Sequence, residues 1–193
     1  MARNLSPEKR SRYLQSALNL FVANGITKTS TAAIAKDAGT AAGTLFLYFP
    51  TKQDLIHELV LDIAHQQSDY IYSLLASSLP ARETFHTIWG GSIQWFFDNM
   101  DSYLYIRQVR DSGLIAEEVV RESEQYLSYY FDAIQKGLEE GAIKTYPLDL
   151  IGTFLYQGIV AVMNLLSSGA NPGQDQVYIQ NGFDIFWNGI KTE

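Results

Sequence analysis

The chain has 193 residues and a net charge of −7 at pH 7, with 47% hydrophobic and 18% charged residues. This length and composition are typical of one large or two small globular domains with a substantial core. The sequence contains no cysteine, which excludes disulfide bonds and thiolate metal sites. No apolar run follows the first basic residue, so we expect no signal peptide and a cytoplasmic protein.

The first predicted helix begins at Ser6-Pro7, because serine is a favoured N-cap and proline fits the first helical turn. Apolar side chains then recur at helical spacing until Asn24-Gly25, a pair that favours a helix end. This buried stripe consists of Tyr13, Leu14, Ala17, Leu18 and Phe21.

Residues 29–55 predict two short helices joined by a tight turn, followed by the start of a third helix. Gly39 can adopt the positive φ that ends the first of them, and residues 40–49 form the second. Two short helices with a glycine turn form a helix-turn-helix, whose second helix enters the major groove of DNA. The side chains that face its core are Ile34, Ala35, Ala38, Leu45 and Phe49.

Thr51 and Asp54 have the spacing of a capping box, which predicts a long helix from residue 52 to about residue 78. We find no β-alternation and no internal repeat, so the predicted fold is all-α with nine helices. A turn is predicted at 171–173. The remaining helices are predicted from residue 80 and over 102–111, 116–140, 147–168 and 174–191.

Residues 150–169 form a run without any charged residue, and this run is long enough to span a membrane. Polar residues interrupt this run and no basic cluster flanks it. A helix that is apolar nearly all round is typical of a core or an interface. We therefore favour burial against protein and expect no membrane partner.

The charge is unevenly distributed along the chain. Residues 1–55 hold seven basic and three acidic residues, a net +4, whereas residues 56–193 hold seven basic and eighteen acidic ones, a net −11. A basic end on an acidic body confines phosphate affinity to that end. The excess of positive charge in residues 1–55 is modest, and a random distribution of charged residues along the chain is the alternative explanation.

The residues of the helix-turn-helix segment resemble the N-terminal signature of the TetR family of transcriptional repressors. This resemblance covers about the first quarter of the chain. It implies a DNA-binding domain over residues 1–52, with the motif at about 30–49, and a ligand-binding and dimerisation domain over 53–193. The matching residues are Thr31, Ile34, Ala35, Ala38, Gly39, Gly43, Thr44, Leu45, Tyr48, Phe49, Lys52 and Leu55.

The resemblance also implies roles in DNA binding. Thr31 would contact a phosphate through its hydroxyl and amide groups. Thr44, Tyr48 and Lys52 would hold the DNA backbone as well. The positions that would face the groove are Thr40, Ala41, Ala42 and Leu47.

Two departures from the family pattern affect the expected readout of bases. Phe46 stands where many members have a tyrosine, so one hydroxyl contact to phosphate is absent. Ala41 and Ala42 can touch a thymine methyl but cannot make bidentate contacts to bases. We expect sparse direct readout, with specificity from Thr40, Thr44, thymine contacts and DNA shape.

Residues 85–187 are rich in aromatic side chains, which at helical spacing are usually core but which also suit the walls of a small-molecule site. The resemblance implies a ligand cavity in this body. An acidic end of the ligand could form an ion pair with Arg107 or Arg110. Either arginine could equally pair with an acidic residue on the protein surface. The candidate ligand-binding residues are Trp89, Ile93, Phe96, Tyr103, Arg107, Tyr126, Tyr130, Tyr156, Gln157 and Met163.

By the same resemblance, the last two helices would form a four-helix interface with their copies in a homodimer. The residues assigned to this interface are Phe154, Ile159, Val162, Leu166, Phe183, Phe186 and Trp187.

An enzyme is the main alternative class, but no G-x-S-x-G motif occurs and residues 39–44 lack the lysine of a phosphate-binding loop. His57 and His65 lie eight residues apart near Glu58 and Asp62, which leaves a metal site open, although Leu61 lies between them. A structural or solvated role is favoured. We therefore expect no catalytic residue, no metal and no cofactor.

Together these features predict a ligand-responsive DNA-binding regulator, a repressor that binds a near-palindromic operator as a homodimer. A small apolar or aromatic effector would release it. The alternative is a helical small-molecule-binding or interaction module with little sequence-specific DNA binding.

Overall fold

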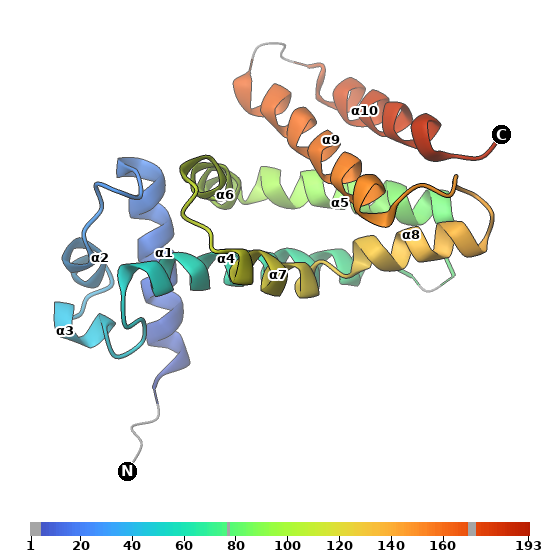
Figure 1. The fold of residues 1–193 in the computed structure, drawn as a ribbon. Helices are drawn as coiled ribbons and strands as arrows, with labels where there is room; N and C mark the ends of the chain where they lie inside the picture. The colour runs from blue at the N-terminus through green and yellow to red at the C-terminus, as the bar shows by residue number, and fades with distance from the viewer. Residues whose placement is uncertain (1–4, 77, 170–172) are drawn as a thin grey trace. The chain divides into compact units, whose positions relative to one another are not determined.

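A computed structural model describes residues 5–76, 78–169 and 173–193 of the chain (Figure 1). Within these residues the fold consists of helices without a named strand, so the predicted all-α class is confirmed. The predicted turn at 171–173 lies mostly outside the described residues. The helices are α1 (Pro7–Asn24), α2 (Thr31–Asp37), α3 (Ala42–Leu45), α4 (Lys52–Leu74), α5 (Ala81–Asp98), α6 (Met100–Ser112), α7 (Glu117–Tyr126), α8 (Tyr129–Glu139), α9 (Leu148–Ser168) and α10 (Asp175–Ile190).

The local signals for helix ends act as predicted. The Ser6 hydroxyl accepts a hydrogen bond from the Lys9 amide and caps α1. Thr51 and Asp54 form a reciprocal capping box, in which the Thr51 amide donates to Asp54 Oδ2 at 2.8 Å and the Asp54 amide donates to Thr51 Oγ1 at 3.1 Å. These bonds satisfy amides that the first turn of a helix leaves without partners.

The helix predicted over 116–140 is two helices, so the described residues contain ten helices rather than nine. The chain turns at Leu127 and Ser128 between α7 and α8. The Ser128 hydroxyl shares a 2.8 Å hydrogen bond with the Tyr72 hydroxyl of α4. This tertiary contact at the break joins residues 56 positions apart, which helical periodicity cannot anticipate.

The chain divides into two compact units. Unit 1 comprises Met1–Ala64 and Asn99–Glu124, and unit 2 comprises His65–Asp98 and Gln125–Glu193. The predicted division near residue 52 is a boundary in sequence and stays a prediction. Compactness instead groups the first half of α4, together with α6 and most of α7, with the N-terminal helices.

Unit 1 is held by packing of α6 against α1 and α4. The rings of Phe21 and Tyr105 stack with centroids 5.9 Å apart and an interplanar angle of 13°. The buried Tyr105 hydroxyl donates a 2.8 Å hydrogen bond to the Ile56 carbonyl. These contacts hold α6 against α1 and α4.

Unit 2 packs α5 against α8, α9 and α10. Trp89 of α5 lies at its centre, 1% exposed, and its Nε1 donates a 2.9 Å hydrogen bond to the Ile179 carbonyl. Gly158 of α9 and Gly182 of α10 are required there, because a Cβ at either position would lie 2.8 Å from the Trp89 ring. Small residues at these two positions therefore let α9 and α10 reach the tryptophan.

Helix α9 is long and apolar enough to cross a membrane by length and composition alone, and 28% of its most apolar window is buried within the chain. It packs against α5, α8 and α10, so part of its apolar surface is already covered.

Candidate nucleic-acid interface

Helices α2 and α3 form the predicted helix-turn-helix. After α2, Gly39 adopts φ 71°, its amide donates to the Lys36 carbonyl, and the Thr40 amide donates to the Ala35 carbonyl. These two bonds are the Schellman pattern of a glycine-terminated helix. The turn orients α3, and the core beneath it contains the predicted Ile34, Ala35, Ala38, Leu45 and Phe49, all buried.

Small and apolar side chains dominate the outer surface of α3 and the residues beside it. Ala41, Ala42 and Gly43 are exposed. Two large apolar side chains follow, Phe46 at 43% exposed and Leu47 at 56% exposed. Methyl and methylene groups can contact a thymine methyl, whereas base hydrogen bonds need polar side chains.

Thr40 differs from the other residues predicted to face the groove. Its Oγ1 accepts a 2.8 Å hydrogen bond from the Tyr13 hydroxyl and donates to the Ala35 carbonyl at 3.2 Å. The side chain therefore fastens the start of α3 to α1, and in this structure its hydroxyl is already committed within the protein. Thr44, also predicted to contact DNA, is half-buried in α3.

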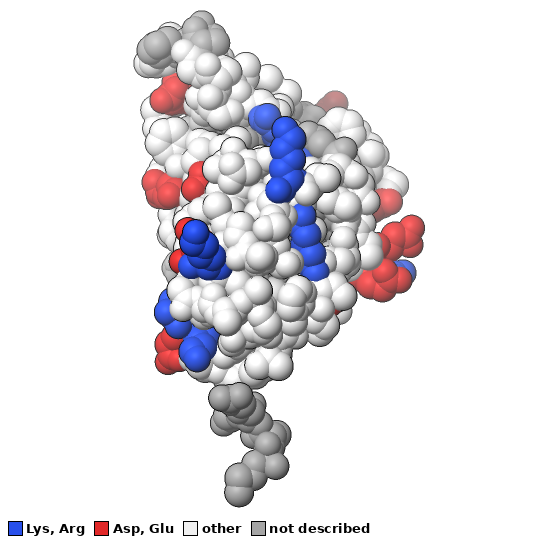
Figure 2. All heavy atoms as spheres, turned by 90° about the vertical axis from the view of Figure 1, so that its left-hand side faces the viewer, with Lys and Arg blue, Asp and Glu red and all other residues white. Residues whose placement is uncertain are grey.

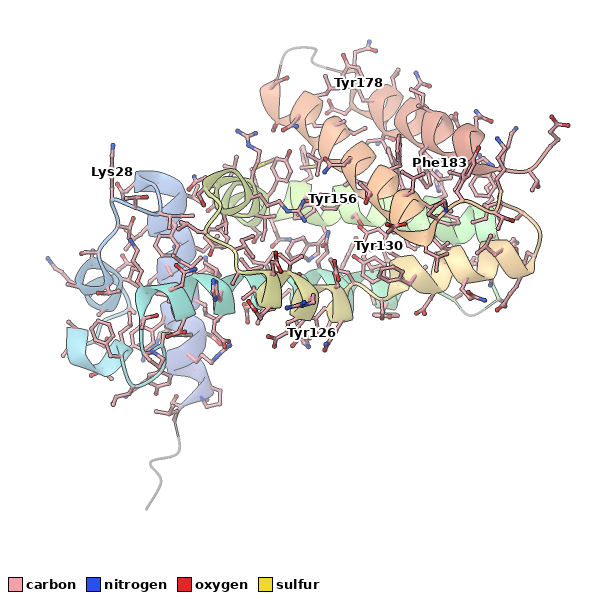
Figure 3. The ribbon with its side chains drawn as sticks, in the orientation of Figure 1. Lys28, Tyr126, Tyr130, Tyr156, Tyr178 and Phe183 are labelled. Carbon is pink, nitrogen blue, oxygen red and sulfur yellow. The ribbon has the colours of Figure 1, made fainter. Side chains whose placement is uncertain are left out.

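An open depression of about 560 Å³ lies between the N-terminal ends of α2 and α4. Thr31 is the first residue of α2, preceded by the N-cap Ser30. Lys28 is exposed, and its side chain extends away from the ribbon (Figure 3). The depression is lined by Thr27, Lys28, Thr29, Ser30, Thr31, Phe46, Pro50, Thr51 and Lys52.

Basic side chains are spread across the side of unit 1 that carries α2 and α3, and most acidic side chains in this view lie toward its margins (Figure 2). Arg10 does not add free positive charge, because it forms ion pairs with Glu58 and, at 3.6 Å, with Asp62. Lys28 and Lys36 are exposed. Lys28 is not among the DNA-binding residues predicted from the sequence, although it is exposed in the loop just before α2.

Lys52 is not simply directed at solvent. Its Nζ donates hydrogen bonds to the Ile26 carbonyl at 2.6 Å and the Thr27 carbonyl at 3.4 Å, and lies 5.9 Å from the centre of the Phe21 ring. Partial burial lowers the pKa of its ammonium group. The predicted phosphate-binding lysine thus ties the start of α4 to the loop before α2.

Tyr48 is also engaged within unit 1. Its hydroxyl accepts a 3.1 Å hydrogen bond from the Ser6 amide, and its ring lies 5.3 Å from the Tyr13 ring. Its role toward the DNA backbone stays a prediction.

Comparison with known families decides the identity of this architecture. Residues 14–59 match the family described as "Bacterial regulatory proteins, tetR family", and residues 60–192 match "Tetracyclin repressor-like, C-terminal domain". The chain belongs to the TetR family. It is therefore a DNA-binding transcription regulator and not an enzyme.

Relatives of this TetR-family regulator agree with that assignment. The HTH-type transcriptional regulator LuxR of Vibrio harveyi is 34% identical over 91 residues, which span 47% of this chain and 44% of LuxR. The uncharacterized HTH-type transcriptional regulator YhgD of Bacillus subtilis is 24% identical over 142 residues, 72% of this chain and 74% of YhgD. A putative tetR family transcription regulator from Shewanella sp. PV-4 has a similar solved structure, with a TM-score of 0.88, 26% identity and coverage of 96% and 99%.

The residues predicted to bind an effector fall in both units of the TetR-family chain. Tyr103 and Arg107 belong to unit 1 and the other eight to unit 2. Within unit 2 the structure places Tyr130 and Tyr156 among the helices (Figure 3), with Tyr130 8% exposed and Tyr156 half-buried. Ile93, Phe96 and Met163 are buried, Tyr126 is half-buried and Gln157 is exposed.

Trp89 is committed to packing, with its ring stacked on Phe186 at 6.1 Å and pressed against Gly158 and Gly182. Gln157 lines a different feature, an apolar groove of about 520 Å³ between α9 and α10. Trp89 and Gln157 are therefore weaker candidates for an effector wall than Ile93 and Phe96 of α5 and Tyr130 of α8.

The residues predicted at the dimer interface differ in how far they are exposed in the single chain. Phe154 is 64% exposed and lines the groove between α9 and α10, and Leu166 is half-buried. The other five are less than a tenth exposed within a single chain, which leaves little of their surface for a partner. They are Ile159, Val162, Phe183, Phe186 and Trp187.

Proposed function

We propose that this regulator is a ligand-responsive repressor that binds a near-palindromic operator as a homodimer and is released by a small apolar or aromatic effector. The observation that carries the proposal is a complete helix-turn-helix in a chain that matches the family over both its N-terminal and C-terminal regions. Such a protein acts in the cytoplasm, where bacterial DNA lies.

Dimerisation is proposed through α9 and α10. Three large apolar side chains on these helices are exposed, namely Leu150 at 44%, Phe154 at 64% and Ile185 at 77%, and all three line the apolar groove. Exposed apolar patches of this kind mark interaction sites. The proposal keeps Phe154 from the residues assigned from the sequence and adds Leu150 and Ile185 in place of the five buried ones.

The dimer would present two copies of α3 to half-sites about 34 Å apart, one turn of B-DNA. Thr31 and Lys28 would contact phosphates beside the depression between α2 and α4. Ala42 and Leu47 would contact thymine methyls, and DNA shape would supply the remaining specificity.

The effector is proposed to enter the core of the C-terminal body and to favour a dimer whose heads are mis-spaced for the operator. Ile93, Phe96 and Tyr130 supply the apolar and aromatic surface that small-molecule sites favour. A ligand shifts such an equilibrium only by its differential affinity for the two states, so a hundredfold preference supplies about 2.7 kcal/mol.

A second candidate is a helical small-molecule-binding or interaction module with little sequence-specific DNA binding. It is favoured by one observation, the exposed surface of Ala41, Ala42 and Gly43, which lacks polar side chains that can read bases.

Selection of bound duplexes from a random pool, with purified protein at moderate salt, separates the two. Enrichment of one near-palindromic site supports the dimeric regulator. Weak, salt-sensitive binding without enrichment of any sequence overturns it and supports the second candidate.

A further inference from the structure

Three buried polar side-chain atoms in unit 2 make no hydrogen bond of good geometry within the described residues. They are Gln67 Nε2 of α4, Ser92 Oγ of α5 and the Tyr129 hydroxyl of α8. Their residues are 6%, 0% and 1% exposed, respectively. Native proteins rarely leave buried polar atoms without partners, so three on adjoining helices require an explanation.

Ser92 and Tyr129 are neighbours where α5 packs on α8. Burial is the main cause that raises the pKa of Tyr129, and the neighbouring Tyr130 raises it further. Hydrogen bonding with the Ser92 hydroxyl has a smaller opposing effect on this pKa, so the two hydroxyls lie close together. The Tyr129 ring lies edge-on to Tyr72 of α4, with centroids 5.7 Å apart. Tyr129 therefore stands where α4, α5 and α8 meet.

Gln67 faces the same region. Ile71 of α4 reaches so close to Gly91 of α5 that a Cβ on this glycine would lie 2.9 Å from Ile71 Cδ1. Gln67 precedes Ile71 by four residues and therefore shares its face of the helix. Helices α4 and α5 run antiparallel (Figure 1), so the residues of α4 before Ile71 run along the residues of α5 after Gly91, which include Ser92.

These atoms are suited to an uncharged oxygen acceptor. Gln67 Nε2 can only donate hydrogen bonds, and Tyr129 stays protonated because burial raises its pKa far above the physiological range. Ser92 can donate as well. Donors buried on adjoining helices in an apolar setting match a carbonyl, ester or hydroxyl oxygen.

A charged ligand group fits this region less well. The lysine and arginine residues of unit 2 are Arg82, Lys136, Lys144 and Lys191, and its two histidines, His65 and His86, are exposed. Lys136 lies two turns beyond Tyr129 on α8 and pairs with Glu140 at 3.8 Å, and Arg82 pairs with Asp184 at 3.8 Å. A carboxylate beside Gln67, Ser92 and Tyr129 would therefore be buried without a cation from unit 2, which is costly.

We propose that Gln67, Ser92 and Tyr129 form the hydrogen-bonding anchor of the effector site, and that the effector presents an uncharged oxygen acceptor on an apolar body. This inference rests on the proposed ligand response and specifies its chemistry. It replaces the acidic effector end considered from the sequence.

The test uses Tyr129→Phe, Ser92→Ala and Gln67→Leu in the full-length chain. The probes are 2-decanone and acetophenone, compared with decanoate and benzoate, and binding is followed by thermal shift and calorimetric titration. The wild type is expected to bind the two ketones more tightly than the two carboxylates. Each substitution should weaken ketone binding by about fivefold, the effect of one neutral hydrogen bond.

Tyr105→Phe is the matched control, because its buried hydroxyl has a partner in the Ile56 carbonyl. It should lower the melting temperature of the ligand-free protein, whereas Tyr129→Phe should leave it unchanged or raise it. A loss of stability from Tyr129→Phe as large as that from Tyr105→Phe would overturn the inference, since the Tyr129 hydroxyl would then have a structural partner.

Absence of ketone binding to the wild type, a preference for the carboxylates, or equal ketone binding by all variants would overturn it as well. Release of operator DNA is measured separately by fluorescence anisotropy. Ketone binding that depends on the three residues but leaves DNA bound would uphold the anchor and refute the proposed ligand response.

Discussion

Lys52 Nζ donates a 2.6 Å hydrogen bond to the carbonyl of Ile26, 26 residues earlier in the chain. The bond connects the first residue of α4 to the loop that leads into α2. A lysine at this position therefore positions the helix-turn-helix, in addition to whatever contact it makes with a phosphate.

Substitution of Lys52 by methionine should weaken operator binding while leaving its salt dependence nearly unchanged, because the side chain acts mainly on the protein backbone. Lys28→Met is the matched control on the same depression. It should reduce the slope of log K against log salt by about 0.9, the effect of one lost phosphate contact. Fluorescence anisotropy titrations between low and moderate salt measure both slopes. An equal loss of slope in the two variants would show that Lys52 is a phosphate ligand.

Replacement of thymine by uracil in the selected operator should weaken binding by about fourfold for each methyl group that Leu47 or Ala42 contacts, since each buried methyl is worth about 0.8 kcal/mol. Leu47→Ala should abolish this sensitivity at the thymine that Leu47 touches. Comparison of both proteins on both duplexes forms a double-mutant cycle. Independent effects of the DNA and protein changes would rule out the contact.

Phe154→Asp and Ile185→Asp should each convert the dimer to a monomer, because an unpaired carboxylate would be buried in an apolar contact. We expect dimer affinity to fall by about a hundredfold or more. Sedimentation velocity at micromolar concentrations measures the change. Phe131→Asp, at an exposed position of α8 that does not line the groove, should leave the dimer intact. Dimers that persist in both groove variants would place the interface elsewhere.

Gly158→Ala should destabilise the protein by about 1–3 kcal/mol through overpacking. Its Cβ would lie 2.8 Å from the Trp89 ring, which the Ile179 carbonyl and the Phe186 ring hold in place. Gly152→Ala in the same helix should instead stabilise by about 0.5–1 kcal/mol, because the nearest atom would be Ile134 Cδ1 at 3.9 Å. Urea unfolding at one protein concentration compares the two. A similar change in both would contradict the close contact.

The sequence was sufficient for the helix-turn-helix because its signals are local. The capping box at Thr51 and the glycine turn at Gly39 act between residues three to five positions apart, and both appear in the structure as expected. The break between α7 and α8 was missed because it coincides with a contact from Ser128 to Tyr72. A continuous apolar stripe cannot show where such a contact will fall.

The candidate sites were less predictable than the fold. The sequence predicts that Thr40 faces the groove of DNA. In the structure its hydroxyl oxygen accepts a hydrogen bond from the hydroxyl of Tyr13, 27 positions earlier in the chain. Ile159 and Phe154 are both large apolar residues of α9, yet one is 1% exposed and the other 64%. The apolar character of a side chain favours its burial. It does not show whether the side chain is buried within its own chain or against a second copy of the protein.

The sequence by itself determined the helical class, the DNA-binding motif and its family, because caps, turns and apolar periodicity depend on residues within one or two helical turns. Only the tertiary structure decided what Lys52 and Thr40 hold, which face of α9 remains exposed, and that polar atoms of Gln67, Ser92 and Tyr129 are buried. Each of these depends on how different helices pack, and the relative placement of side chains from separate helices is a property of the folded chain.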